Sequence, residues 1–373
     1  MAQQNGRQQH QEVTSTTIDP DDFVSGIDNP YFPLQPGTTL VYESPDGTTF
    51  ETFAITDKTV KILGVTCIVV EHTAIVDGQV AEYTLDYFAQ DVDGNVWYFG
   101  ESVKNYEDGH FVDRDGSWKG GVDGAEPGII MEASPQVGDV YQQENYPGVA
   151  EDMAEVISLD ASVDVPYGSF DGVLQTDDFT PLEPGIIEHK FYVEGVGNVL
   201  VVNDTTGEQE LLVKIVIDGS SHDDTLLGKI GTDELNGHAG DDELDGAAGN
   251  DTIDGGQGSD SLAGGSGDDA FDWNNQNESG TMANSRDVVT DFEGAGAAGG
   301  DVIDVSDIAA AVGAFTFIGT GTFTGTGEVR AVDNGSDTGS ILEFNIAGNE
   351  NPEMTIEVLG VDETAWTSDD FVF

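Results

Sequence analysis

The sequence has little cysteine, few basic residues and no long apolar run. Cys67 is the single cysteine of 373 residues, which excludes an intrachain disulfide and a cysteine-ligated zinc site. Lys and Arg number only 11 against 72 Asp and Glu, so the formal net charge is −61. Such a surface repels phosphate groups, which argues against nucleic acids and anionic membranes as partners. No apolar run approaches the roughly 18 residues of a membrane-spanning helix, so no transmembrane segment is predicted.

The first 25 residues are rich in Gln, Ser, Thr and Asp and have almost no large apolar side chains. This composition predicts a flexible leader over residues 1–25. The first residues also lack the charged and apolar regions of a cleaved export signal. By that test alone, the protein would be cytosolic.

Residues 26–215 consist of short apolar runs separated by turn residues, which predicts an antiparallel β domain. The turn dipeptides Asp77-Gly78 and Asp93-Gly94 separate adjacent runs, as in β-hairpins. Tyr83, Leu85 and Tyr87 alternate with polar residues, the period-2 pattern of a strand with one buried face. Further strands are expected at 50–55, 67–75, 96–99, 137–143, 152–159, 170–179, 188–193, 198–203 and 208–214. Helical periodicity is scarce, so we expect a curved sheet or partial barrel.

Residues 216–272 repeat a nine-residue unit, Gly-x-x-Gly-x-Asp-x-apolar-x, six times. An aspartate recurs at every ninth position, as Asp224, Asp233, Asp242, Asp251, Asp260 and Asp269. The glycine two positions earlier is His222 in the first repeat and then Gly231, Gly240, Gly249, Gly258 and Gly267. A disordered linker would not keep four positions in register over this length, so the repeat predicts regular structure.

Two repeats would form one 18-residue coil, which stacks each Asp beside the Asp two repeats later. Glycine permits tight turns and leaves carbonyl groups exposed. Carboxylates and carbonyls that converge in this way form an all-oxygen cage, which suits Ca²⁺. Four stacked pairs then predict about four calcium ions: 224/242, 233/251, 242/260 and 251/269. Without a cation the carboxylates repel one another, so we expect the segment to fold only at about millimolar calcium.

This nonapeptide pattern resembles that of the repeats-in-toxin (RTX) family, whose repeats form a calcium-binding parallel β-roll. The last hundred residues, 273–373, resemble the C-terminal domain of serralysin-type secreted proteins. The resemblance rests on 287–292, on 301–308, and on the ending Asp369-Asp370-Phe371-Val372-Phe373. It implies an uncleaved C-terminal signal that type I (ABC-transporter) secretion machinery reads in a Gram-negative bacterium, with the protein extracellular. Protease activity does not carry over, because the chain has no His-Glu-x-x-His motif.

The first domain offers weaker candidates. The stretch 29–42 and the stretch 195–200 resemble parts of uncharacterised bacterial secreted β domains. His72 and His189 would form a metal or acid/base pair if their strands were adjacent; otherwise they are surface or hydrogen-bonded histidines. Four acids near 146–148 are either solvated or hold paired carboxylates for glycoside chemistry, namely Glu144, Glu151, Asp152 and Glu155. Asp91–Asn95 and Asp113–Ser117 are interpreted as turns, and Cys67 as buried and inert.

The sequence therefore predicts an all-β protein: an antiparallel β domain (26–215), a parallel β-roll (216–272) and a C-terminal β domain (273–373). The leading functional hypothesis is a secreted calcium-binding protein with an extracellular binding or structural role, acting with a cell-surface or matrix partner. The alternatives are a secreted hydrolase with its active site in residues 26–215, and a carrier of a small apolar ligand. No catalytic residue is assigned from the sequence, and the balance favours a non-enzyme.

Overall fold

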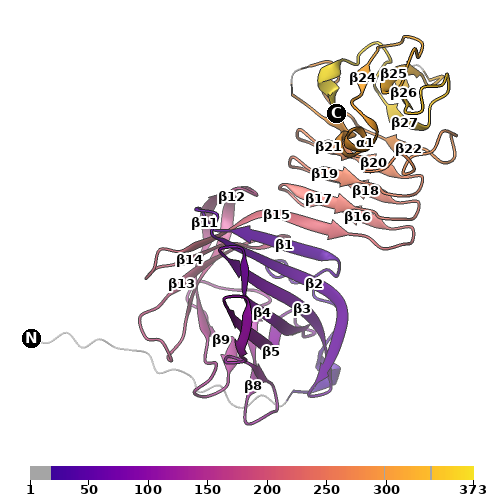
Figure 1. The fold of residues 1–373 in the computed structure, drawn as a ribbon. Helices are drawn as coiled ribbons and strands as arrows, with labels where there is room; N and C mark the ends of the chain where they lie inside the picture. The colour runs from indigo at the N-terminus through magenta and orange to yellow at the C-terminus, as the bar shows by residue number, and fades with distance from the viewer. Residues whose placement is uncertain (1–17, 298, 337) are drawn as a thin grey trace, which may run out of the picture.

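A computed structural model describes residues 18–297, 299–336 and 338–373. Figure 1 shows a strongly curved N-terminal sheet, a stack of short parallel coils, and a small C-terminal unit at the far end of the stack. The all-β prediction is confirmed, including the antiparallel domain, the parallel β-roll and the C-terminal β region. No helix in the described ranges is long and apolar enough to cross a membrane.

The N-terminal domain is an antiparallel sheet in which most strands pair with their neighbours in sequence. The first strands run β1–β2–β3–β4–β5, and the last run β11–β12–β13–β14–β15. Strand β15 returns to pair with β1, so the two groups form one continuous sheet. The strands are β1 (Thr38–Glu43), β2 (Thr49–Ile62), β3 (Val65–Val76), β4 (Gln79–Gln90), β5 (Val96–Glu107), β6 (His110–Asp113), β7 (Trp118–Lys119), β8 (Glu126–Met131), β9 (Val140–Gln142), β10 (Glu144–Asn145), β11 (Met153–Val165), β12 (Gly168–Phe179), β13 (Glu188–Val193), β14 (Gly197–Asn203) and β15 (Gln209–Asp218).

One short segment, residues 140–145, joins the two remaining edges of this sheet. Its first part, β9, pairs with β11, and its second part, β10, pairs with β8, which itself pairs with β5. The seam is tight: a Cβ on Gly128 would overlap the carbonyl oxygens of Gln142 and Gln143. The predicted curved sheet or partial barrel is therefore nearly closed, and it surrounds an interior.

The chain packs against the N-terminal domain from the start of its described part. Ile18 and Phe23 lie against a small core that includes Cys67 and Phe99, and a short 3-10 helix, η1 (Pro20–Asp22), lies between them. Phe23 also forms an isolated bridge with Asp91. The rest of the predicted leader, residues 1–17, lies outside the described residues.

The nine-residue repeats form a roll with two parallel faces. One face contains β16 (Thr225–Leu227), β18 (Glu243–Asp245) and β20 (Ser261–Ala263), and the other contains β17 (Asp233–Asn236), β19 (Thr252–Asp254) and β21 (Ala270–Asp272). The single apolar residue of each repeat points inward and is at most 7% exposed; these residues are Leu226, Leu235, Leu244, Ile253, Leu262 and Phe271. Two repeats make one coil, as predicted, because each strand pairs with the strand 18 residues later.

Both faces of the roll continue into neighbouring regions. Strand β15 pairs in parallel with β17, so the N-terminal sheet runs directly into one face. At the other end, that face continues through β23 (Val302–Asp304) to β28 (Phe371–Val372). The opposite face continues through β22 (Asp287–Val289) into an antiparallel sheet of β27 (Met354–Leu359), β26 (Gly339–Asn345) and β25 (Glu328–Asp333), with β24 (Thr316–Phe317) at its edge. A helix, α1 (Ser306–Val312), and a 3-10 turn, η2 (Ser368–Asp370), complete this end.

Candidate functional site

The repeat aspartates form two ladders along the roll. In each ladder the Oδ1 atom of one Asp accepts a hydrogen bond from the backbone N–H of the Asp 18 residues earlier. All four predicted pairs are present, at 2.7 Å for 224/242, 2.8 Å for 233/251, 2.9 Å for 242/260 and 2.9 Å for 251/269. The predicted 18-residue coil therefore brings these carboxylates together as expected.

The ladders extend one step beyond the repeats. Asp287 accepts from the Asp260 N–H and Asp301 from the Asp269 N–H, both at 3.0 Å, across 27 and 32 residues. The sequence search missed both residues because the intervening chain breaks the nine-residue spacing. Each is nevertheless followed two positions later by a buried apolar residue, Val289 and Ile303, and this pattern could have identified them.

The four inner aspartates differ from those at the ends of the ladders. Asp242, Asp251, Asp260 and Asp269 are each at most 3% exposed, and the Oδ2 atom of each is buried with no hydrogen-bond partner among the described residues. A buried carboxylate oxygen without a donor is costly unless a cation or proton neutralises it. The inner positions therefore require a positive charge that the described protein atoms do not provide.

Three of the four terminal aspartates, Asp233, Asp287 and Asp301, have protein donors on both oxygens, and Asp224 has donors on Oδ2. Asp233 accepts from the Tyr167 hydroxyl at 2.9 Å and from the Lys229 N–H. At the far end of the same ladder, Asp301 Oδ2 accepts from the Glu293 N–H at 2.7 Å, and at the far end of the other ladder Asp287 Oδ2 accepts from the Trp273 indole N–H at 2.8 Å. The ends of the ladders are thus capped by hydrogen bonds, and only the inner positions are left open.

Burial raises the pKa of the inner aspartates, and neighbouring carboxylates raise it further. The pKa is raised to about 8 for Asp251 and Asp260 and to about 6 for Asp269, although each accepts a backbone hydrogen bond that opposes the shift. Without a cation, folding would therefore require Asp251 and Asp260 to take up protons at neutral pH, which opposes folding, whereas Asp269 would be mostly ionised. A bound cation removes both costs.

The predicted ligand glycines lie where a side chain could not. A Cβ on Gly258 would overlap the carbonyl oxygen of Gly240, and a Cβ on Gly267 would overlap that of Gly249. Gly231 is enclosed by the ring and carbonyl of Tyr167 in the same way. No group of three or more His, Cys, Asp or Glu side chains gathers around one point within the described ranges. Backbone carbonyls would therefore supply the remaining oxygens for a cation, which fits Ca²⁺.

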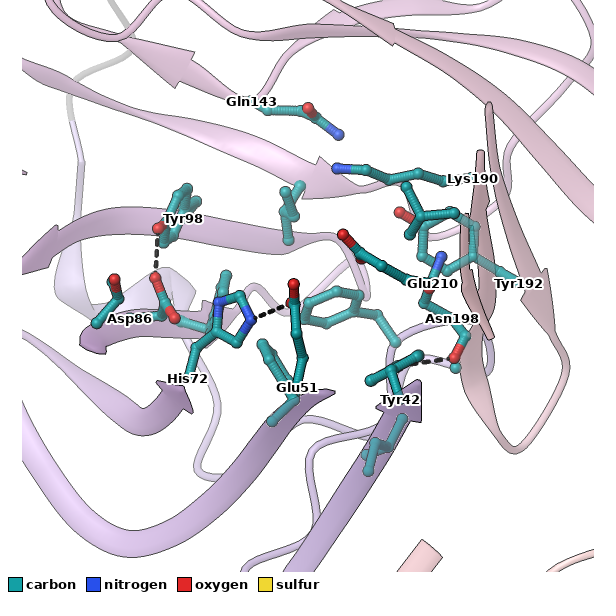
Figure 2. Close-up of a pocket in the computed structure, with 18 of the residues that line it drawn as sticks. Tyr42, Glu51, His72, Asp86, Tyr98, Gln143, Lys190, Tyr192, Asn198 and Glu210 are labelled. Atoms are coloured by element: carbon teal, nitrogen blue, oxygen red, sulfur yellow. Dashed lines mark hydrogen bonds and ion pairs between the residues drawn. The ribbon is translucent and has the colours of Figure 1, made fainter. Parts of the chain in front are cut away.

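The N-terminal sheet encloses a cavity of about 530 Å³. Its wall combines aromatic rings with eight acidic side chains, which are Glu51, Glu82, Asp86, Glu101, Glu144, Asp152, Glu188 and Glu210. Glu144 and Asp152 belong to the acidic cluster considered from the sequence, whereas Glu151 and Glu155 do not line this cavity. The cavity was not predicted, because its lining comes from strands distant in sequence (Figure 2).

The two histidines considered from the sequence do not form a pair. His72 on β3 lies in the cavity wall and its Nε2 is 2.7 Å from Glu51 Oε2, whereas His189 on β13 contacts Asp177 at 2.6 Å. Strand β3 pairs with β2 and β4, and β13 pairs with β12 and β14, so the condition for a His72–His189 site is not met. Burial opposes the charged form of His72, but the hydrogen bond and charge of Glu51 outweigh it and raise the His72 pKa.

The remaining sequence candidates are structural. Asp91 accepts hydrogen bonds from the backbone of Asp93 and Asn95, so this segment is a hairpin turn as predicted. Asp113 likewise accepts from the Asp115 N–H. Cys67 is fully buried, and burial raises the pKa of its thiol to about 12, which makes it unreactive at neutral pH.

Comparisons with known proteins bear on the C-terminal half. Residues 192–373, slightly less than half the chain, match the family model described as peptidase M10 serralysin C terminal. No curated protein matches this chain. Together with the ladder geometry, this match indicates an RTX-type β-roll of the calcium-binding kind in the C-terminal half.

Solved structures resemble parts of the chain. The AlgE6R3 subunit of the mannuronan C5-epimerase from Azotobacter vinelandii is 30% identical with a TM-score of 0.32, over 42% of this chain and 80% of that one. The AlgE6R2 subunit of the same enzyme is 26% identical with a TM-score of 0.33, over 42% and 91%. A Bacteroides fragilis protein with a YmcC-like fold is 14% identical with a TM-score of 0.29, over 50% and 98%. These scores are too low to assign a shared fold or function.

Proposed function

We propose that this chain is a secreted protein whose C-terminal roll folds around about four calcium ions after export by type I secretion machinery. The observation that carries the proposal is the set of four unpartnered Oδ2 atoms, on Asp242, Asp251, Asp260 and Asp269. One ion beside each atom would give the predicted number. Each Oδ2 lies against the first glycine of its own repeat; for example, a Cβ on Gly255 would be 2.6 Å from Asp260 Oδ2.

Calcium would supply the positive charge that offsets the ladder carboxylates. Cytosolic calcium is too low to fill weak extracellular-type sites, whose dissociation constants are about 10⁻⁴–10⁻³ M. The roll would therefore stay unfolded in the cell and fold in the medium. Residues 215–373 contain 33 acidic and three basic residues, so repulsion would keep the calcium-free segment extended.

The position of the C-terminal tail supports this order of events. Phe371 is 7% exposed, because β28 closes the end of one roll face and the Phe371 ring packs against Phe317 and Trp366. In the folded protein, the buried Phe371 side chain of this tail would be inaccessible to a transporter. Recognition of the tail as an export signal therefore requires that the C-terminal half be unfolded inside the cell.

An export assay tests the proposal. The full chain and a variant lacking residues 369–373 would be produced with a type I transporter, and the protein in the medium would be measured. We expect the full chain outside and the truncated variant inside. A control Val312→Ala variant, changed at a 47% exposed side chain outside the tail, should be exported normally. Equal export of the full and truncated chains would contradict a C-terminal signal.

The extracellular role assigned to the N-terminal domain is binding of a ligand or of a cell-surface or matrix partner. The cavity favours a small-molecule ligand over a purely structural role, because its volume of about 530 Å³ falls within the roughly 300–1,000 Å³ of small-molecule sites. Its charged lining is poorly suited to the apolar ligand considered from the sequence. Among the described residues no Ser or Cys lines the cavity, so its carboxylates are the best candidates for a hydrolase.

A further inference from the structure

Strand β4 presents Thr84 and Asp86, together with Phe88, to the interior and its two tyrosines outward. Thr84 and Asp86 are only 2% and 6% exposed, whereas Tyr83, Leu85 and Tyr87 on the opposite face are partly exposed. Burial of a carboxylate opposes folding, so a domain that needed only a stable core would favour the reverse orientation. The inward polar face is therefore a feature of the cavity rather than of the core.

Two cavity acids have one oxygen held in place and one oxygen free. Asp86 is 6% exposed and its Oδ1 accepts from the Tyr98 hydroxyl at 2.5 Å (Figure 2). Glu144 is 9% exposed and its Oε1 accepts from the Trp118 indole N–H at 3.0 Å. The second oxygen of each carboxylate has no donor in the part of the chain that the structure describes. Both side chains line the cavity, so these oxygens can accept from a bound molecule.

The cavity has more negative charge than its own basic groups can balance. Eight acids line it, and the basic lining residues are His72 and Lys190. His72 is paired with Glu51, and the Lys190 Nζ lies 3.1 Å from Asp178, which is outside the cavity lining, and 3.9 Å from the cavity acid Glu188. Neither basic group forms an ion pair with Asp86 or Glu144 among the described residues, although the charge of His72 lowers the pKa of Asp86 and that of Lys190 lowers the pKa of Glu144. A positively charged ligand would relieve this excess of negative charge.

A cross-strand pair of acidic residues adds to the crowding of carboxyl groups. Asp86 on β4 lies directly opposite Glu101 on β5, and both line the cavity. Like charges in this position destabilise a sheet. Burial, together with neighbouring acids, raises the pKa of Glu101 to about 9, which fits a site that lacks a counterion.

Aromatic rings lie beside these carboxylates. The rings of Phe88 and Tyr98 stack with centroids 4.8 Å apart, and the Phe53 ring lies 6.3 Å from Phe88. All three residues line the cavity. In such an arrangement the aromatic wall binds the apolar part of a molecule and the carboxylates bind its charged part. Ring faces also attract organic cations.

A bare metal ion fits this cavity poorly. No cluster of three or more potential metal-ligating side chains occurs in the described residues, and the volume is far larger than one ion requires. We propose that the N-terminal cavity binds a small organic cation. Its ammonium group contacts Asp86 and Glu144, and its apolar part lies against Phe53, Phe88 and Tyr98.

Calorimetric titration of the full chain in millimolar calcium tests this proposal. Three amines, 2-phenylethylamine, tryptamine and hexylamine, would be compared with their neutral alcohols 2-phenylethanol, tryptophol and hexan-1-ol. Each pair has nearly the same shape and differs in charge. We expect at least one amine to bind about tenfold or more tightly than its alcohol, a difference of about 1.4 kcal/mol. If every alcohol binds as tightly as its amine, or if no amine binds, the proposal is wrong.

Substitutions locate the site. Glu144→Gln keeps an acceptor for Trp118 and removes the charge, and Asp86→Asn does the same beside Tyr98. Each should weaken amine binding about tenfold and leave alcohol binding unchanged, with thermal unfolding used to confirm that the variant is folded. Glu107→Gln, at an exposed position on β5, is the matched control and should bind amines normally. Equal weakening by Glu107→Gln would overturn the assignment, as would normal amine binding by folded Glu144→Gln and Asp86→Asn.

Discussion

The Tyr167 hydroxyl donates a 2.9 Å hydrogen bond to Asp233 Oδ1 and so joins the N-terminal domain to the first step of one aspartate ladder. Tyr167 lies in the turn between β11 and β12, is 2% exposed, and encloses Gly231 of the roll. Asp233 is also the first residue of β17, which pairs in parallel with β15 of the N-terminal sheet. The roll therefore begins in direct contact with the N-terminal domain.

Removal of this hydroxyl should weaken the start of the roll. Tyr167→Phe keeps the ring but deletes a buried hydrogen bond to a carboxylate, worth about 1.5–3 kcal/mol. We expect the calcium midpoint for roll folding to rise, measured by circular dichroism during calcium titration. Tyr106→Phe, on β5 and remote from the ladder, is the control. An unchanged midpoint in Tyr167→Phe would show that the cap does not contribute.

The inner aspartates should contribute more to calcium binding than the first one. The sequence predicts the largest losses for Asp242→Ala and Asp251→Ala, because each belongs to two stacked pairs. The extended ladders place Asp260 and Asp269 in the same position. We expect each of these four substitutions to remove about one ion, counted by calorimetry. Asp224, whose Oδ2 already accepts from Ser220, should have a smaller effect; an equal loss in Asp224→Ala would contradict the ladder account.

In two repeats, a residue other than glycine has a positive φ, a backbone conformation that favours glycine. Ala247 has a φ of 71° and His238 a φ of 70°, where Gly256 and Gly265 occupy the equivalent position in the next two repeats. A left-handed conformation costs a non-glycine residue roughly 1–2 kcal/mol. Ala247→Gly should therefore stabilise the roll by about 1 kcal/mol, partly offset by the greater freedom of glycine when unfolded.

For Ala247→Gly, calcium titration should give a lower calcium midpoint for folding of the roll. Gly258→Ala provides the opposite comparison, because its Cβ would overlap the Gly240 carbonyl oxygen and should raise the midpoint or abolish folding. A higher midpoint in Ala247→Gly would contradict the assigned strain.

The N-terminal domain should lose stability as the pH rises. Burial and like charges raise the pKa of Glu101 to about 9, and burial raises that of Glu144 to about 7, against roughly 4.3 for an unfolded glutamate. A group with a raised folded-state pKa contributes stability that is fully present at pH values below the unfolded pKa. This contribution is lost as the pH rises through the folded value.

We therefore expect the urea midpoint of this domain, followed by tryptophan fluorescence in millimolar calcium, to fall between about pH 5 and pH 9. Glu101→Gln should flatten the upper part of this profile. The other titratable cavity groups are unchanged in that variant: Glu51, Glu82, Asp86, Glu144, Asp152, Glu188, Glu210, His72, Lys190 and the three tyrosines. An identical slope in both proteins would show that Glu101 does not titrate in this range.

The repeat could be predicted because the residues that specify each coil lie close together in the sequence. Six aspartates in strict register are sufficient to specify the coil, whereas Asp287 and Asp301 join the ladders only after insertions that no fixed period describes. The cavity could not be predicted, because it depends on how the sheet closes at residues 140–145. The alternation in β4 correctly predicted a strand but not which face is buried. The face with Tyr83 and Tyr87 is partly exposed, and the cavity faces Thr84, Asp86 and Phe88.

The central claim is that the roll folds only when a cation neutralises its inner aspartates. Amide hydrogen exchange of residues 225–272 in the full chain, measured at neutral pH with chelator and again in millimolar calcium, tests it most directly. We predict no protection in chelator and strong protection at Leu235, Leu244 and Ile253 once calcium is added. Equal protection of these amides in chelator would contradict the account.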